Sequence, residues 1–135
     1  MKRGMLEKVK RLVQEVKVVY VATSDKEGVP HLAAAEGMTF AKEGEIVFRA
    51  WFCLKTVENL VTNPKLSLAI LHPVTGEGYQ ILGEIERIEK GAFLDGFRPE
   101  EEKKWAGYPQ AEHQLSIRIE KVSSLTSGPH SDEFI

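Results

Sequence analysis

Six short apolar segments, separated by turns of hairpin length, constrain the fold of this chain more than any other feature of its sequence. Residues 65–71 show the pattern, because Leu66, Leu68 and Ile70 recur at the period of two that places side chains on one face of a strand. Connections this short join antiparallel strands. We therefore expect a mainly β fold, a six-stranded and mainly antiparallel barrel. Its strands are predicted at residues 18–23, 31–40, 45–50, 65–71, 79–89 and 114–122.

Three segments follow a helical pattern instead, and we expect these helices around the barrel. Residues 5–16 place apolar side chains on one face and charged side chains on the other. Residues 55–62 form a short helix that an Asn-Pro pair ends, because Pro disfavours helical geometry in the residue before it. Residues 99–105 carry Pro in the first turn and acids before bases. Within the strand at 79–89, Gly83 indicates a bulge or a close backbone approach.

The length and charge of the chain limit its partners. The 135 residues suit one domain, which we place at residues 1–125, followed by a polar tail at 126–135. Eighteen Lys and Arg residues against twenty Asp and Glu residues leave a net charge of -2. This charge gives no overall field to hold nucleic acid or an anionic membrane, so any anion site must be local.

Cysteine content and hydropathy predict a cytoplasmic protein. The one cysteine, Cys53, excludes an internal disulfide and fits a reducing compartment. No stretch approaches the roughly 18 apolar residues that a membrane span requires, and the amino terminus has no uninterrupted apolar signal segment.

The start of the helix at 55–62 is the strongest candidate for a binding site. A helix amino terminus offers unpaired backbone N–H groups and a partial positive charge, to which Lys55 adds an ammonium and Thr56 a hydroxyl. Together these groups could hold a phosphate. The same residues also fit a plain helix start, in which Thr56 caps the helix and Lys55 is solvated.

Two other segments could contact a flat heterocycle. Residues 33–35 are all Ala, and such small side chains in a strand would let a ring lie against the backbone, although close packing of a helix on that face is the more common explanation. Gln80 can donate and accept hydrogen bonds, but Gln is also common on surfaces. His31 lies next to these residues, and a lone His is more often structural than catalytic.

The sequence contains no familiar catalytic or metal-binding motif. The four histidines lack ligand spacing, so we expect no metal site, and nucleophile-elbow, P-loop and dinucleotide-binding patterns are absent. We therefore assign no catalytic residue.

The order of the features resembles the flavin-binding split-barrel family, which includes pyridoxamine 5′-phosphate oxidase and the small bacterial FMN-binding proteins. The likeness covers roughly residues 6–125, and the chain is closest in size to the small FMN-binding proteins. Four motifs in the right order carry it. They are residues 19–23 with 28–32, residues 44–48, residues 55–60 with 63–68, and residues 78–84.

The resemblance implies a homodimer of split barrels with FMN bound at the subunit interface. It implies that Lys55 and Thr56 hold the FMN phosphate, with Asn59 one helical turn further on. For the isoalloxazine ring, it implies a strand whose backbone meets the ring, a strand before the phosphate loop and a polar residue near the ring edge. These residues are Pro30, His31, Leu32 and Ala33; Phe48, Arg49 and Ala50; and Gln80.

The sequence departs from the pyridoxamine phosphate oxidases at two places. Their flavin strand is rich in Arg and their carboxyl-terminal segment is basic, whereas here the strand reads His-Leu-Ala-Ala-Ala and the chain ends in acidic residues. We therefore expect an FMN-dependent oxidoreductase or electron-transfer protein with a small-molecule donor and acceptor. The alternatives are a non-catalytic flavin or haem binding module, and a deazaflavin-dependent reductase.

Overall fold

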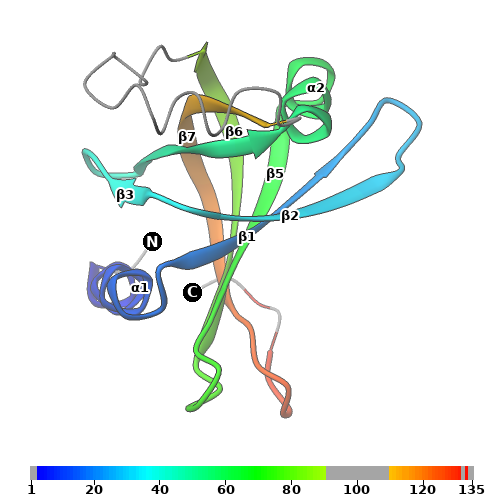
Figure 1. Ribbon diagram of the computed structural model, residues 1–135. Helices are drawn as coiled ribbons and strands as arrows, with labels where there is room; N and C mark the ends of the chain where they lie inside the picture. Colours follow the sequence, from blue (N-terminus) through cyan, green and yellow to red (C-terminus); the bar gives the residue numbers. More distant parts are fainter. Residues whose placement is uncertain (1–2, 91–109, 132, 134–135) are drawn as a thin grey trace.

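The computed structural model describes residues 3–90, 110–131 and 133, which form two helices and one seven-stranded sheet (Figure 1). The expected helix at 99–105 lies outside the described residues. The elements, in chain order, are α1 (Arg3–Val16), β1 (Val18–Ser24), β2 (Pro30–Glu36), β3 (Met38–Phe40), β4 (Glu45–Cys53), α2 (Leu54–Thr62), β5 (Lys65–Leu71), β6 (Gly78–Lys90) and β7 (Gln110–Ser124).

The strands form an antiparallel sheet that curls into a half-barrel, which confirms the expected fold class. Their order across the sheet is β2-β1-β5-β6-β7-β4-β3, and every neighbouring pair is antiparallel. The two edge strands, β2 and β3, follow each other in the sequence. A single chain segment therefore links the two edges of the curled sheet (Figure 1).

The strand count differs from the expected six because the segment at 31–40 divides at Gly37 into β2 and β3. Gly37 has φ +110°, a backbone conformation that side-chain-bearing residues rarely adopt. On one side of this corner β2 pairs with β1, and on the other side β3 pairs with β4. The buried positions change phase at this corner, since Ala35 and Met38 are both buried although they are three residues apart. The small side chains before Gly37 hide this change of phase in the sequence pattern.

The core lies on the concave face of the sheet. Alternate residues of β1, β4 and β5 are buried there. The helix α1 covers β5, β1 and β3 with its apolar face through Val9, Leu12 and Val13. Among the described residues, neither helix is long and apolar enough to cross a bilayer.

Gly83 lies at a bulge, as its position in the sequence predicts. The register between β6 and β7 shifts between Leu82 and Gly83. A Cβ atom at Gly83 would lie 2.6 Å from Ile117 Cγ2, which is closer than real contacts allow, and 3.0 Å from the carbonyl oxygen of Arg118. A larger residue at this point would force β7 or the Ile117 side chain to shift.

Candidate functional site

The amino terminus of α2 begins without a side-chain cap. Cys53 is the N-cap residue, with extended backbone angles (φ -60°, ψ 147°), and its side chain makes no capping hydrogen bond. Thr56 lies inside the first turn, so the interpretation of Thr56 as the cap is wrong. The first N–H groups of α2 have no capping side chain as acceptor, and Lys55 is exposed beside them. This combination is suited to bind an anion.

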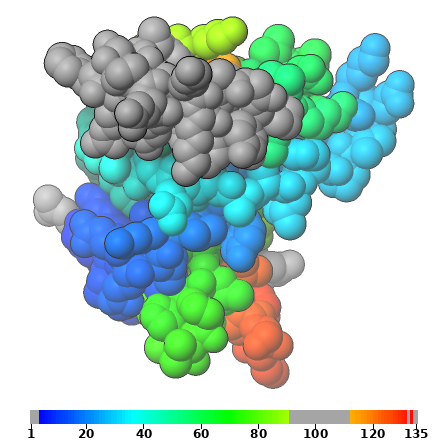
Figure 2. Space-filling model, in the orientation of Figure 1, coloured from blue at the N-terminus to red at the C-terminus, as the bar shows by residue number. Residues whose placement is uncertain are grey.

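Thr56 and His31 come together from separate elements, α2 and β2. The Thr56 side chain is fully buried, and its Oγ1 atom lies 3.4 Å from His31 Nδ1 in a hydrogen bond whose direction depends on the imidazole tautomer. His31 is half-buried. Figure 2 shows β2 in light blue on the surface next to the green of α2. The structure thus brings together two residues that the sequence analysis placed at opposite ends of the cofactor.

Two more side-chain hydrogen bonds join the same helix face to the end of β1. Asn59, which is 1% exposed, donates from Nδ2 to Thr23 Oγ1 at 3.1 Å. Asn63 donates from Nδ2 to Ser24 Oγ at 2.9 Å. Asn59 was among the predicted cofactor residues, whereas Thr23, Ser24 and Asn63 were not. The one signal in the sequence is the spacing of three between Thr56 and Asn59, with Asn63 four residues further on at the expected end of the helix.

The charge at this end of α2 is set by Lys55 and Asp25. Asp25 lies in the β1–β2 turn, where its carboxylate accepts hydrogen bonds of 2.9 Å from the N–H groups of Val29 and Glu27. The Val29 hydrogen bond is the main cause that lowers the pKa of Asp25, and the nearby charge of Lys55 lowers it further. Lys55 is therefore close enough to this turn for its ammonium to stabilise the ionised carboxylate.

Two other residues predicted to bind the cofactor, Arg49 and Ala50, line a cavity of about 460 Å³. It lies between the ends of β2 and β4, and Ala34, Ala35 and Trp51 also line it. Two residues of the alanine run, Ala34 and Ala35, thus border this cavity. Arg49 is half-exposed and lies 3.8 Å from Glu112 Oε1 through its Nε atom.

Phe48 lies in the core, away from this cavity. Its side chain is fully buried, and its ring meets that of Phe52 edge to face with a centroid separation of 5.1 Å. A contact between Phe48 and a surface ligand would therefore involve its backbone. Its side chain instead anchors β4 beneath Arg49 and Ala50.

Leu32 and Gln80 lie on the convex face of the sheet. Residues directly opposite each other in antiparallel strands point to the same face, and Ala34, Tyr20, Ala69 and Gln80 are paired in one row across β2, β1, β5 and β6. Gln80 is half-buried and donates from Nε2 to Ser67 Oγ at 2.8 Å. Leu32, two residues before Ala34, is on the same face, whereas His31 and Ala33 point to the opposite side. Pro30 is exposed at the start of β2.

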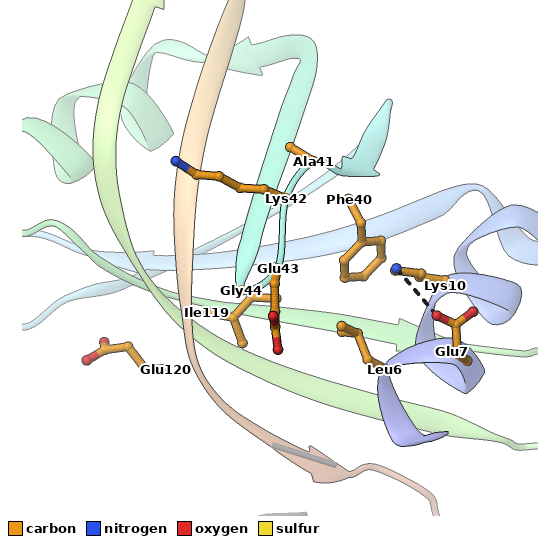
Figure 3. A pocket seen from close by; sticks show the side chains of 10 residues that line it. All are labelled: Leu6, Glu7, Lys10, Phe40, Ala41, Lys42, Glu43, Gly44, Ile119 and Glu120. Atoms are coloured by element: carbon orange, nitrogen blue, oxygen red, sulfur yellow. Dashed lines mark ion pairs between the residues drawn. The ribbon is translucent and has the colours of Figure 1, made fainter. Parts of the chain in front are cut away.

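A larger cleft of about 700 Å³ lies away from all of these residues, between α1 and the β3–β4 turn (Figure 3). Lys10 is 5.7 Å from the centre of the Phe40 ring and 3.5 Å from Glu7 Oε1, and Lys42 is 3.3 Å from Glu45 Oε2. Both lysines are thus already paired with glutamates. Volume alone does not make this cleft the better candidate, because the predicted cofactor residues lie elsewhere.

Within residues 3–90, 110–131 and 133, no group of three or more His, Cys, Asp or Glu side chains is placed to hold a metal ion.

The amino-acid sequence matches the family model described as pyridoxamine 5′-phosphate oxidase over residues 5–125. An uncharacterized protein of Methanocaldococcus jannaschii is 30% identical over 131 residues, which covers 96% of this chain and 85% of the relative.

Solved structures with different ligands in their descriptions share the fold. An FMN-binding protein from Syntrophomonas wolfei has a TM-score of 0.71 at 16% identity and covers 94% of this chain and 90% of its own. An F420 reductase has a TM-score of 0.62 at 16% identity, covering 84% and 94%. HutZ, the haem storage protein of Vibrio cholerae, has a TM-score of 0.57 at 17% identity, covering 87% and 92%.

At these identities the structures show a common fold and leave the ligand open, whereas the family model matches nearly the whole chain. The protein belongs to the pyridoxamine 5′-phosphate oxidase family.

Proposed function

We propose that this protein binds FMN non-covalently and acts as an oxidoreductase or electron-transfer protein. The observation that carries the proposal is the uncapped amino terminus of α2, with Lys55 exposed beside it and Thr56 joined to His31. The family relationship supports a flavin as the ligand, and the FMN-binding relative of known structure has the same fold.

The residues at this terminus fit a phosphate monoester. Lys55 would contribute a charge-assisted hydrogen bond, and the first backbone N–H groups of α2 would contribute neutral ones. The buried Thr56 side chain already bonds to His31, so Thr56 would donate to the phosphate through its backbone N–H. Asn59, one turn further along α2, would stabilise this end of the helix through its hydrogen bond to Thr23.

The isoalloxazine ring would lie along β2 and β4. The backbone of Pro30 to Ala33 and of Phe48 to Ala50 would border it, and the cavity beside Arg49 and Ala50 offers room at its edge. FMN supplies the electron or hydride transfer chemistry, and the protein supplies binding and orientation. This division of roles agrees with the absence of a catalytic motif in the sequence.

The proposal includes a homodimer with the flavin at its interface. The convex face of β2, β1, β5 and β6 supports it, because apolar side chains remain exposed there: Leu32 is 67% exposed and Tyr20 is 44% exposed. A second copy on this face would bury both side chains, and Gln80 on the same face would then lie at the interface beside the flavin. We place the dimer in the cytoplasm, where Cys53 remains a free thiol.

Haem and a deazaflavin are the alternative ligands to FMN, since HutZ and the F420 reductase share the fold. A haem-binding module would bind haem and would not bind FMN more tightly than riboflavin, which lacks the phosphate. A deazaflavin-dependent reductase would bind the deazaflavin more tightly than FMN.

The decisive experiment compares FMN with riboflavin, which lacks the phosphate. Titration of the purified protein, followed by flavin fluorescence, should give tighter binding of FMN. Lys55→Ala should weaken FMN binding by about 1.5–3 kcal/mol, the range for a hydrogen bond to a charged group, and leave riboflavin binding unchanged. Lys8→Ala, which removes an exposed lysine of α1, is the matched control and should not alter either affinity.

Equal affinities for FMN and riboflavin in the unaltered protein would reject the phosphate site. Bleaching of the bound flavin by a reduced nicotinamide would support a redox role, whereas binding without turnover would favour a storage or sensing module.

A further inference from the structure

The face of α2 that packs on β1 and β2 is joined to them by three side-chain hydrogen bonds, Thr56–His31, Asn59–Thr23 and Asn63–Ser24, which we call the polar ladder. We propose that the polar ladder positions the amino terminus of α2 and thereby sets the affinity for the flavin phosphate. Thr23, Ser24, Asn59 and Asn63 are then positioning residues rather than ligands. This inference rests on the proposed function, because it concerns the phosphate end of the same site.

The polar ladder has one regular geometry. Thr56 and Asn59 lie one turn apart on the same face of α2, and Asn63 is the C-cap residue that follows the last turn of the helix. On the sheet, Thr23 and His31 are paired opposite each other across β1 and β2, and Ser24 is the next residue of β1. Three successive positions along the helix thus meet one corner of the sheet.

Hydrogen bonds fix the position of a helix more narrowly than apolar contacts do. Sliding α2 by one residue would move it about 1.5 Å and rotate each donor away from its acceptor. The cost would be high at Asn59 and Thr23, which are 1% and 4% exposed, because buried polar groups without partners lose the compensation for their lost hydration. The polar ladder therefore selects one position of α2, and Lys55 and the free N–H groups move with the helix.

The distance along α2 distinguishes a positioning role of the polar ladder from direct contact with the phosphate. Asn63 is the C-cap of α2 and lies about 13 Å of helix rise from Leu54, where the phosphate would be held. Asn63 and Ser24 therefore cannot contact a phosphate at the amino terminus. An effect of this hydrogen bond on phosphate affinity would have to act through the position of the helix.

The test uses Thr23→Val, which keeps the shape of the side chain and removes the hydroxyl, and Thr23→Ser, which keeps the hydroxyl. We expect Thr23→Val to weaken FMN binding about tenfold, the effect of one lost hydrogen bond, and to leave riboflavin binding within twofold. Thr23→Ser should keep the preference for FMN over riboflavin that the unaltered protein shows. In the ligand-free protein, amide hydrogen exchange at residues 54–62 should be faster in Thr23→Val and unchanged in Thr23→Ser.

An equal loss of FMN and riboflavin affinity in Thr23→Val would overturn the inference, since a general loss of structure does not distinguish the two ligands. An unchanged preference for FMN would also overturn it. If Thr23→Val does not fold, Ser24→Ala at the more exposed end of the polar ladder replaces it, with a smaller loss expected in FMN alone.

Failure of the proposed function is separable from failure of this inference. If the unaltered protein does not prefer FMN to riboflavin, the phosphate assignment fails, and the inference about phosphate affinity falls with it. If the unaltered protein prefers FMN while exchange at 54–62 is the same in Thr23→Val as in the unaltered protein, the phosphate assignment stands and the polar ladder is overturned.

Discussion

The backbone N–H of Arg49 donates a hydrogen bond of 3.2 Å to the carbonyl oxygen of Gly37, at the corner where the chain passes from β2 to β3. A Cβ atom at Gly37 would overlap the carbonyl oxygen of Arg49. The corner links the two edges of the sheet and brings β2 against β4, the two strands that border the cavity beside Arg49 and Ala50. The shape of the candidate site therefore depends on the absence of a side chain at Gly37.

Gly37→Ala should strongly destabilise the fold. The backbone at φ +110° costs about 1–2 kcal/mol for a residue with a Cβ atom, and the overlap with β4 adds about 1–3 kcal/mol. Urea unfolding followed by circular dichroism measures the loss. Gly28→Ala is the control, because Gly28 has φ +85° but a Cβ atom there would meet nothing within 4 Å. This variant should lose only the part of the stability that comes from the backbone conformation. Equal losses of unfolding free energy in the two variants would show that the overlap with the Arg49 carbonyl oxygen does not destabilise the fold.

Leu32→Glu should dissociate the proposed homodimer. Leu32 is 67% exposed on the convex face, and burying two carboxylates in a symmetric interface without partners is unfavourable. Light scattering after size exclusion would give the mass of a dimer for the unaltered protein and a monomer for the variant. Val74→Glu, at an 86% exposed position in the β5–β6 loop, should leave the mass unchanged. A monomeric unaltered protein would reject the dimer itself.

The sequence predicted the strands better than their connections in space. The period of two located β5 and β6 almost to the residue, since one face of each strand is buried in the core. It did not locate the corner at Gly37, because the small residues before Gly37 hide the change of phase between the buried Ala35 and the buried Met38. For the site, Lys55 and Thr56 were predicted from their place at a helix start. Thr23 and Ser24 were missed because their importance comes from α2, which is distant in the sequence.

Lys65→Met should lower the melting temperature at pH 7, and the difference should shrink in acid. Lys65 Nζ lies 2.8 Å from Glu120 Oε1 and 3.2 Å from Glu84 Oε2. The hydrogen bond from Lys65 is the main cause that lowers the pKa of Glu120 below its ordinary value of 4.5, and the hydrogen bond to Glu120 is the main cause that raises the pKa of Lys65 above 10.5. A lowered carboxyl pKa stabilises the fold above 4.5, and this contribution is lost as pH falls through the folded value. The raised pKa of Lys65 stabilises the fold below 10.5 and is lost as pH rises through its folded value.

Thermal unfolding at pH 7 and at pH 3 checks this prediction, with Lys8→Met as a control that removes the same charge from α1. Lys65 and Glu120 are exposed and Glu84 is partly exposed, so high salt should also reduce the effect. A difference that is the same at both pH values would mean that the ion pairs do not contribute.

The contact between Thr56 and His31 should appear as a coupling energy. Thr56→Val and His31→Leu each remove one side of the 3.4 Å hydrogen bond, and each should cost about 1 kcal/mol of stability. The double variant should lose less than the sum of the two by about 0.5–1.5 kcal/mol, because the bond can be lost only once. The control combines His31→Leu with Thr39→Val, whose hydroxyl donates to the Val47 carbonyl on the other edge of the sheet, and this pair should be additive. Additivity in the Thr56 and His31 pair as well would mean that the hydrogen bond does not stabilise the junction of α2 with β2.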